Sequence, residues 1–251
     1  MNPGMLIDIT KCIGCEACSR ACKEANNLPP EMDPILTWKT WKVIVQQKGL
    51  FYAKACMHCD NPTCVSVCPV GAMKKTELGP VVYHPEICIG CRYCLQACPF
   101  RIPKYEWNNP TPVVGKCIMC YGRVSAGKPT ACSSVCPTGA TIFGNHDDLL
   151  REAKQRIGLN PNLYVDHIYG EKEAGGTSIL YLAPLSFAEL GFNTKGMEQV
   201  FPALTWKVQK EIPKVFSITG VMMMGLWWII NRREKYGDKT PDEIDEMQKH
   251  Q

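Results

Sequence analysis

Sixteen cysteines constrain this 251-residue chain more than any other feature, because they fall into four groups of four. The groups are Cys12, Cys15, Cys18, Cys22; Cys56, Cys59, Cys64, Cys68; Cys88, Cys91, Cys94, Cys98; and Cys117, Cys120, Cys132, Cys136. The first and third groups have the spacing C-x2-C-x2-C-x3-C, which is a ligand run for 4Fe–4S clusters. We therefore predict four 4Fe–4S clusters, with all sixteen cysteines as iron ligands.

Disulfides and zinc are the alternative uses of these cysteines. A disulfide framework is typical of short secreted chains with scattered cysteines, whereas gaps of two residues recur here. Zinc is the better alternative, but a structural zinc site takes two C-x2-C pairs and rarely a third cysteine two residues on. Cys18 and Cys94 are such third cysteines. They favour iron–sulfur clusters and one-electron transfer.

The charge balance points to no polyanionic partner. Lys and Arg number 28 against 24 Asp and Glu, and they are spread along the chain, so we expect no nucleic-acid binding. Part of the basic excess offsets the cluster thiolates. Five basic residues near the motifs either raise cluster potentials or stay solvated, and we favour the solvated interpretation for Arg20, Lys23, Arg92, Arg101 and Lys116.

The chain contains an internal repeat. Residues 9–15 match residues 85–91, and the ends of the run 56–72 match those of the run 117–140. This similarity indicates duplication of a two-motif unit. Within the repeated loops, we expect Gly14 and Gly90 to let backbone N–H groups approach the clusters closely.

The remaining sequence predicts short elements around the motifs. Apolar runs predict strands at 5–9, 43–45, 80–83 and 178–182, a turn at 77–80, a helix at 147–157 and short helices after the third cysteines. We interpret residues 158–205 as an extension that packs on the head, and the alternative is a second catalytic domain.

Residues 215–230 contain no charged side chain. A membrane-spanning helix needs about 20 apolar residues, with a lower limit of about 17, so these sixteen are marginal by length. Basic residues flank the run on both sides, and Trp227 and Trp228 suit an interfacial belt. We predict a single transmembrane helix that also contacts lipid, and the alternative is a helix that docks to a partner. The tail from 236 to 251 is polar.

Residues 1–145, with these four motifs, resemble the four-cluster ferredoxin-type subunits of the complex iron–sulfur molybdoenzyme family and of membrane-bound hydrogenases. Residues 175–182 and 206–233 resemble the C-terminal part of formate dehydrogenase beta subunits and hydrogenase-linked ferredoxin subunits. The resemblance implies an α+β fold. Residues 1–146 would form a head of two double-cluster ferredoxin domains, in which the inner domain (about 50–110) is inserted into the outer one. A packing extension (147–205) and a membrane anchor (206–235) would follow this head.

Spacing leaves open which motifs share clusters, because nineteen residues separate Cys68 from Cys88 and eighteen separate Cys98 from Cys117. The resemblance implies a nested assignment, in which the outer motifs pair with each other and the inner motifs pair with each other. Cluster 1 then takes Cys12, Cys15, Cys18 and Cys136; cluster 2 takes Cys56, Cys59, Cys64 and Cys98; cluster 3 takes Cys88, Cys91, Cys94 and Cys68; and cluster 4 takes Cys117, Cys120, Cys132 and Cys22.

The resemblance also implies a function. Single electrons would pass between a catalytic subunit (a hydrogenase, or a molybdenum or tungsten oxidoreductase such as formate dehydrogenase) and a membrane quinone-reactive or cytochrome b subunit. The sequence shows no catalytic residues of its own, and we interpret His58 and His84 as surface or near-cluster residues rather than ligands. The alternatives are a soluble polyferredoxin docked by its apolar tail, a metal-binding structural module without redox turnover, and a reductase in its own right.

Basic residues beside the apolar run number three before it and four after it. This asymmetry slightly favours a cytoplasmic C-terminus and a periplasmic head at the inner membrane. The N-terminal residues show neither an apolar signal region nor a twin-arginine run. We therefore expect either a cytoplasmic chain or one that crosses the membrane folded, with a partner that carries the signal.

Overall fold

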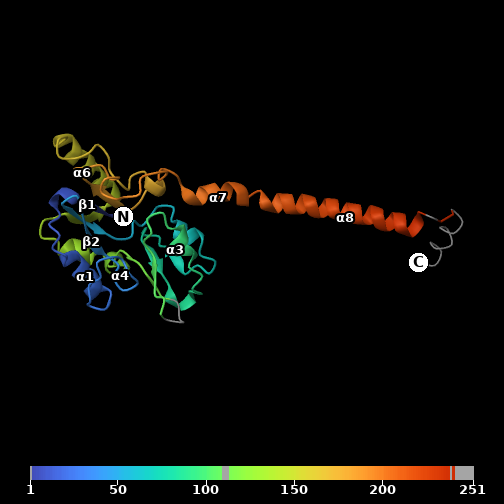
Figure 1. Ribbon diagram of the computed structural model, residues 1–251, viewed down its shortest axis with the longest axis horizontal. Helices are drawn as coiled ribbons and strands as arrows, with labels where there is room; N and C mark the ends of the chain where they lie inside the picture. Colours follow the sequence, from blue (N-terminus) through green and yellow to red (C-terminus); the bar gives the residue numbers. More distant parts are fainter. Residues whose placement is uncertain (1, 109–112, 238, 241–251) are drawn as a thin grey trace. The chain divides into compact units, whose positions relative to one another are not determined.

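The computed structural model describes residues 2–108, 113–237 and 239–240. The chain forms two compact units, Met1–Pro202 and Ala203–Gln251 (Figure 1). The strands are β1 (Pro3–Asp8), β2 (Val43–Gln47), β3 (Leu50–Lys54), β4 (Met73–Lys75), β5 (Val81–Tyr83), β6 (Lys104–Tyr105), β7 (Val114–Gly115), β8 (Thr141–Asn145) and β9 (Ile179–Leu182). The α-helices are α1 (Ala17–Ala25), α2 (Thr63–Ser66), α3 (Tyr93–Ala97), α4 (Tyr121–Ser125), α5 (Ala131–Ser134), α6 (His146–Leu159), α7 (Phe201–Gln209) and α8 (Ile212–Tyr236), and the 3-10 helices are η1 (Ile9–Lys11), η2 (Pro85–Ile87) and η3 (Glu173–Gly175).

Strand β1 is the centre of the first unit. All six of its residues are buried, as its apolar sequence predicts for a strand covered on both faces. It pairs antiparallel with β8 and parallel with β9, so the sheet order is β8-β1-β9. The predicted strands at 5–9 and 178–182 are confirmed. The parallel pairing brings β9, which follows β1 by about 170 residues in sequence, into the same core.

Two hydrophobic cores lie against this sheet. On one side, Leu6 and Leu180 pack with Leu149 and Ala153 of α6. The other core contains Met5 and Ile7 together with cysteines and aromatic side chains from later in the chain. Strand β1 therefore separates a purely structural layer from the layer that contains the cysteine motifs.

Three two-stranded hairpins, β2-β3, β4-β5 and β6-β7, lie between successive motifs along the chain. The predicted strands at 43–45 and 80–83 correspond to β2 and β5. The predicted turn joins β4 to β5, where Gly79 donates a backbone hydrogen bond to Thr76.

The repeat in the sequence is also a repeat in the structure. The C-cap of η1 is Cys12 and that of η2 is Cys88, and both cysteines lie in extended backbone. Helices α1 and α3 then begin after residues in the left-handed conformation, Glu16 with φ 57° and Arg92 with φ 64°. The two loops therefore follow the same path, as duplication predicts.

The predicted helix at 147–157 is confirmed as α6. Its N-cap is Asn145, whose side-chain oxygen accepts a hydrogen bond from the backbone N–H of Asp147 at 3.0 Å. Asp147 and Asp148 lie in the first turn, where negative charge stabilises the positive end of the helix dipole.

The second unit contains most of α7 and all of α8. The stretch Phe201–Lys235 is long and apolar enough to cross a membrane, with a mean hydropathy of 1.4 and no buried residues in its most apolar window. Pro213 lies in the first turn of α8, where its missing N–H leaves no helical bond unmade. Most of the predicted polar tail, 238 and 241–251, lies outside the described residues.

Candidate iron–sulfur centres

All sixteen cysteines carry free thiols, and the disulfide alternative finds no support. Four helices carry five of the sixteen cysteines, and these helices pack in two pairs. Helix α1 packs against α5, and α2 packs against α3. The first pair brings together the two ends of the cysteine region, and the second brings together its middle.

The first motif meets the end of the fourth motif beside β1. One small cavity is lined by all four cysteines assigned to cluster 1, namely Cys12, Cys15, Cys18 and Cys136. The register of β1 with β8 explains this proximity, because Ile7 pairs with Thr141 shortly before Cys12 and shortly after Cys136. Burial raises the pKa of the Cys12 thiol, and the thiolates of Cys136 and Cys15 raise it further.

Cys22 is the last cysteine of the first motif. It interacts with three cysteines of the fourth motif, which are Cys117, Cys120 and Cys132. Burial raises the pKa of Cys22 well above its usual range, and interactions with Cys117, Cys132 and Cys120 add to the rise. The last cysteine of each outer motif is thus near the first three cysteines of the other.

The two inner motifs show the same exchange. Cys59 interacts with Cys56, Cys98 and Cys64 in addition to its burial, and its pKa is raised. Burial and the thiolates of Cys88, Cys91 and Cys68 raise the pKa of Cys94 to about 11.

These environments fit metal-bound thiolates. Burial first, and then Cys56, raise the pKa of both Cys64 and Cys117 to about 12. A metal binds the deprotonated thiolate, so metal binding to these cysteines would release their protons. Within residues 2–108, 113–237 and 239–240, no three His, Cys, Asp or Glu side chains converge on one ion.

Backbone groups already point at the sulfur atoms. The N–H of Met119 donates to Cys117 Sγ at 3.3 Å, and the N–H of Ile102 donates to Cys98 Sγ at 3.5 Å. Gly14 has φ +73° and Gly90 has φ +68°, the left-handed conformation that glycine adopts without strain. Such N–H···S contacts are a means by which a protein adjusts a cluster's potential.

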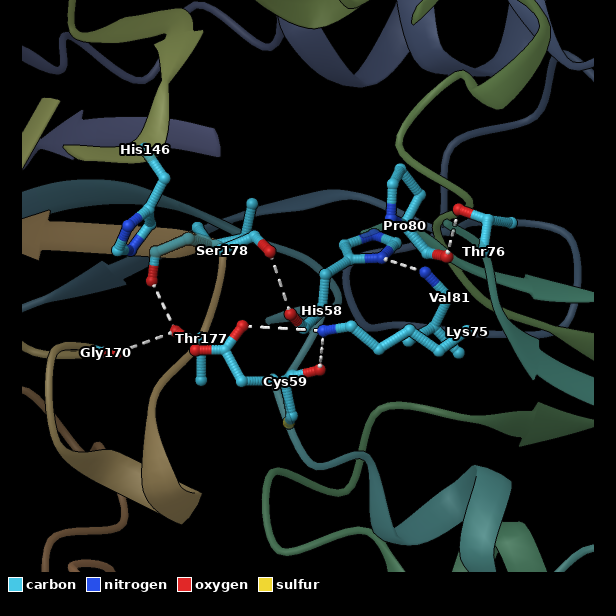
Figure 2. A network of polar contacts seen from close by, with 12 residues as sticks. His58, Cys59, Lys75, Thr76, Pro80, Val81, His146, Gly170, Thr177 and Ser178 are labelled. Atoms are coloured by element: carbon cyan, nitrogen blue, oxygen red, sulfur yellow. Dashed lines mark hydrogen bonds and ion pairs between the residues drawn. The ribbon is translucent and has the colours of Figure 1, made fainter. Parts of the chain in front are cut away.

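His58, between two cysteines of the second motif, is fully buried rather than at the surface. Its Nδ1 accepts a hydrogen bond from the N–H of Val81 at 3.0 Å, and its carbonyl oxygen accepts from the N–H and hydroxyl of Ser178 (Figure 2). Burial holds the pKa of His58 well below its usual range, so the ring is neutral. His84 lies at the surface, where it pairs with Glu86.

Lys75 extends this network on the exposed side of the motif. Its Nζ donates to the carbonyl oxygen of Cys59 at 2.8 Å and pairs with Asp60 at 3.4 Å (Figure 2). The network joins the second motif to the β4-β5 hairpin and to Ser178, the residue before β9. It fixes the loop that presents Cys56 and Cys59.

The solvated interpretation is wrong for two of the five basic residues. Lys23 and Lys116 are 3% and 2% exposed. The Nζ of Lys23 donates to the carbonyl oxygens of Pro29 and Lys39, and that of Lys116 donates to Val81 and Cys117. Backbone carbonyl oxygens replace water around both ammonium groups and offset the free-energy cost of burying them. The sequence alone does not show that these lysines are buried.

The other three basic residues are exposed. Arg20 pairs with Glu16 on the surface of α1. Arg92 lies over the rings of Tyr105 and Trp107, with its guanidinium carbon 4.7 and 4.3 Å from the ring centroids.

Sequence reasoning missed Lys42. It directly precedes β2 and is 2% exposed. Burial alone would lower its pKa, but the thiolates around it, Cys132 and Cys18 above all, outweigh that effect and raise it. Its neighbours in sequence, Trp41 and Val43, carry no signal of this environment.

Comparisons with known proteins agree with these features. The model of a 4Fe–4S dicluster domain matches residues 47–146. A protein of Nitratidesulfovibrio vulgaris strain Hildenborough is 37% identical over 250 residues, which span 92% of this chain and 68% of that protein.

Two further relatives carry informative names. Hydrogenase-2 operon protein HybA of Escherichia coli O157:H7 is 34% identical over 281 residues, covering 92% of this chain and 85% of HybA. The iron–sulfur subunit of the nitrate-inducible formate dehydrogenase of Escherichia coli K12 is 38% identical over 197 residues, covering 70% of this chain and 66% of that subunit.

Proposed function

We propose that this chain, which belongs to the family of 4Fe–4S electron-transfer subunits of oxidoreductase complexes, relays single electrons through four clusters between a catalytic subunit and a membrane partner. The observation that carries the proposal is that the fold brings cysteines of different motifs together. One cavity is lined by Cys12, Cys15, Cys18 and Cys136, and the helix pairs α1–α5 and α2–α3 join the outer and the inner motifs. Four cubanes need sixteen thiolates.

We assign the clusters in the nested arrangement of two double-cluster ferredoxin domains. Clusters 1 and 4 belong to the outer domain and clusters 2 and 3 to an inner domain of about residues 50–110, inserted within a head of 1–146. The shared cavity of the cluster 1 cysteines supports the assignment of Cys136. The interactions of Cys22 with Cys117 and of Cys94 with Cys68 support the other exchanges. Residues 147–205 pack on this head.

The proposed path of the electron runs through clusters 1, 4, 2 and 3 in that order. Its support is a series of interactions between cysteines of neighbouring clusters. Cys18 interacts with Cys132 and joins clusters 1 and 4. Cys117 interacts with Cys56 and joins clusters 4 and 2, and Cys64 interacts with Cys94 and joins clusters 2 and 3.

Both ends of this path lie beside exposed apolar side chains. Ile13 in the first motif is 60% exposed, and Ile89 in the third is 62% exposed. Cys15 is exposed as well. These loops are the places where we expect partner subunits to approach clusters 1 and 3.

The residues of the chain hold and adjust the clusters, while each cluster, when bound, supplies reversible one-electron chemistry. Thiolates fix the irons, backbone N–H groups donate to sulfur, and the aromatic and aliphatic core keeps water away. Water exclusion strengthens each electrostatic contact to the bound clusters.

The anchor and the partners complete the proposal. Residues 206–235 form a single span at the inner membrane and contact lipid, with residues 236–251 as a polar tail and the head on the periplasmic side. The names of HybA and of the formate dehydrogenase subunit favour a hydrogenase or a formate dehydrogenase as the catalytic partner. A quinone-reactive or cytochrome b subunit is the membrane partner.

Serine substitutions at the ends of the motifs test the nested assignment. EPR spectra of the dithionite-reduced, anaerobically purified chain would be compared for four variants, Cys136→Ser, Cys12→Ser, Cys22→Ser and Cys117→Ser. We expect Cys136→Ser and Cys12→Ser to alter one cluster signal, and Cys22→Ser and Cys117→Ser to alter another. If Cys136→Ser and Cys117→Ser change the same signal, the nested assignment is wrong.

Two treatments separate the alternative functions. Reversible bleaching of the visible absorption by dithionite would exclude a module without redox turnover. Retention in the membrane after carbonate extraction would exclude a soluble polyferredoxin docked by its tail, since a docked chain washes off.

A further inference from the structure

Lys42 is a buried cation whose charged atom makes no hydrogen bond. Its side chain is 2% exposed. Within the described part of the chain, its Nζ is shielded from solvent and has no hydrogen-bond partner. Burying an ammonium group without a hydrogen-bond partner costs free energy. We therefore expect a nearby group whose attraction for the positive charge offsets this cost.

The other buried lysines show what a satisfied ammonium looks like in this protein. Lys23 Nζ donates to two carbonyl oxygens at 2.9 and 2.8 Å, and Lys116 Nζ also donates to two carbonyl oxygens. Among the described residues, no such carbonyl oxygen accepts a hydrogen bond from Lys42 Nζ. Its environment is therefore of a different kind.

The leading electrostatic neighbours of Lys42 include cysteines assigned to both outer clusters. Lys42 interacts electrostatically with Cys12 and Cys18, which are assigned to cluster 1. It also interacts with the cluster 4 cysteines, which are Cys22, Cys117, Cys120 and Cys132. Tyr181 is a further neighbour, but its hydroxyl donates to the carbonyl oxygen of Ala53 at 2.9 Å.

We infer that Lys42 lies between clusters 1 and 4 and donates N–H···S hydrogen bonds to their sulfur atoms, and that it holds the potentials of both clusters above the values they would otherwise have. The inference rests on the proposed function. It states that one residue, Lys42, sets the reduction potentials of two neighbouring clusters. Lys42 is a positioning residue, since it acts through the clusters and binds no iron.

The physical reason is charge. Each 4Fe–4S core goes from 2+ to 1+ when it accepts one electron from a reductant, so reduction adds one negative charge to each site. A fixed positive charge in a site of low dielectric stabilises the reduced form more than the oxidised form. Hydrogen bonds to cluster sulfur act in the same direction. Both outer clusters therefore become easier to reduce. Among the described cysteines of clusters 2 and 3, Lys42 is not a leading electrostatic neighbour of Cys59, Cys64, Cys98 or Cys94.

The test is an EPR-monitored redox titration of the full chain, with signals assigned by the cysteine variants described above. Lys42→Met keeps the apolar stem and removes the charge. We expect it to shift the midpoint potentials of clusters 1 and 4 to more negative values and to leave clusters 2 and 3 unchanged. Lys42→Arg should keep both potentials close to those of the wild type. Unchanged potentials in Lys42→Met, or an equal shift of all four, would overturn the inference.

The matched control is Lys154→Met. Lys154 lies on α6, is 56% exposed and pairs with Glu171. The substitution removes the same charge from a surface ion pair outside the motifs, and all four potentials should stay the same. Shifts in this variant equal to those of Lys42→Met would show an unspecific effect of net charge, which also overturns the inference.

A second measurement covers the case in which Lys42→Met does not assemble its clusters. With lysine labelled by 15N at Nζ, ENDOR on the reduced wild-type chain should show 15N couplings on the signals of clusters 1 and 4. The couplings should vanish in labelled Lys42→Arg. Their absence from the wild type, in a chain with full iron content, would refute the inference and leave the proposed function intact, whereas missing iron would refute the proposed function itself.

Discussion

The guanidinium Nη1 of Arg156 donates to Oδ2 of Asp8 at 2.9 Å and links helix α6 to the end of strand β1. Asp8 is 1% exposed, and it also accepts from the hydroxyls of Thr10 and Tyr164. Because Cys12 follows four residues later, this ion pair fixes the start of the first cysteine loop. Helix α6, which follows the last motif in sequence, thus helps to fix the position of Cys12, a proposed cluster ligand.

Arg156→Met should destabilise the protein by about 2–3 kcal/mol, since it leaves the buried Asp8 carboxylate without its cation while two hydroxyl donors remain. The temperature at which the visible absorption bleaches measures this loss. Arg151→Met is the matched control. Arg151 pairs with Asp148 on the exposed side of the same helix, where an ion pair contributes little. Equal effects of the two substitutions would contradict this account of Asp8.

Gly14→Ala should impair the assembly of cluster 1 more than the backbone strain of placing alanine in a left-handed conformation would by itself. A Cβ at Gly14 would lie 2.7 Å from Phe51 Cδ1, and φ is +73°. Gly71 has φ +69° with no atom within 4 Å of an added Cβ. Gly71→Ala therefore carries only the backbone strain of about 1–2 kcal/mol, and Gly14→Ala adds a clash.

Iron content and the amplitude of the cluster 1 EPR signal measure this difference. Gly14→Ala should lose iron and cluster 1 signal, and Gly71→Ala should retain most of both. If the two variants lose the same amount, the contact with Phe51 has no role.

Asp33 should stabilise the loop before Lys42 in a pH-dependent way. The hydroxyls of Thr37 and Thr40 donate to its Oδ2 at 2.6 and 2.7 Å, and these hydrogen bonds lower the pKa of the carboxyl. The unfolded value is about 3.9. The stabilisation is therefore complete above about pH 4 and is lost as the pH falls through the lower folded pKa.

Asp33→Asn tests this dependence. The difference in bleaching temperature between wild type and variant should be constant from about pH 8 to pH 5 and should shrink only below about pH 4. The variant controls for the acid lability of the clusters, which both proteins share. A difference that disappears near neutral pH would show that ionised Asp33 does not hold the loop.

A charge in the middle of α8 should impair membrane insertion. Met223 is 63% exposed within the apolar part of the helix, and a lysine at the centre of a span costs about 2.5–3.5 kcal/mol. Met223→Lys should appear in the supernatant after carbonate extraction. Gln209→Lys, among the basic residues before the span, should remain in the membrane. Release of both variants, or of neither, would count against a span centred on α8.

Local patterns in the sequence predict much of this protein. The cysteine spacing predicts the four motifs, and short apolar runs predict β1, β2, β5 and β9. These features depend on near neighbours in the chain, so a single sequence displays them. The start of α6 is less well determined by sequence, because its N-cap is Asn145, whereas Asp147 and Asp148 carry an equally good cap signal.

Properties that depend on distant residues are not visible in the same way. The gaps after Cys68 and after Cys98 are nearly equal, so spacing alone does not distinguish nested from sequential motifs. Burial is likewise a tertiary property. Lys23, Lys42 and Lys116 look like surface lysines in sequence, and only the folded chain shows that carbonyl oxygens or thiols enclose them.

The most direct measurement of the central claim is the content of iron and acid-labile sulfide in the anaerobically purified chain. Four cubanes predict about sixteen iron atoms and about sixteen sulfide ions per chain, together with visible absorption that dithionite bleaches reversibly. A folded chain that assembles into its complex with zinc in place of iron, or with neither iron nor sulfide, would contradict the account.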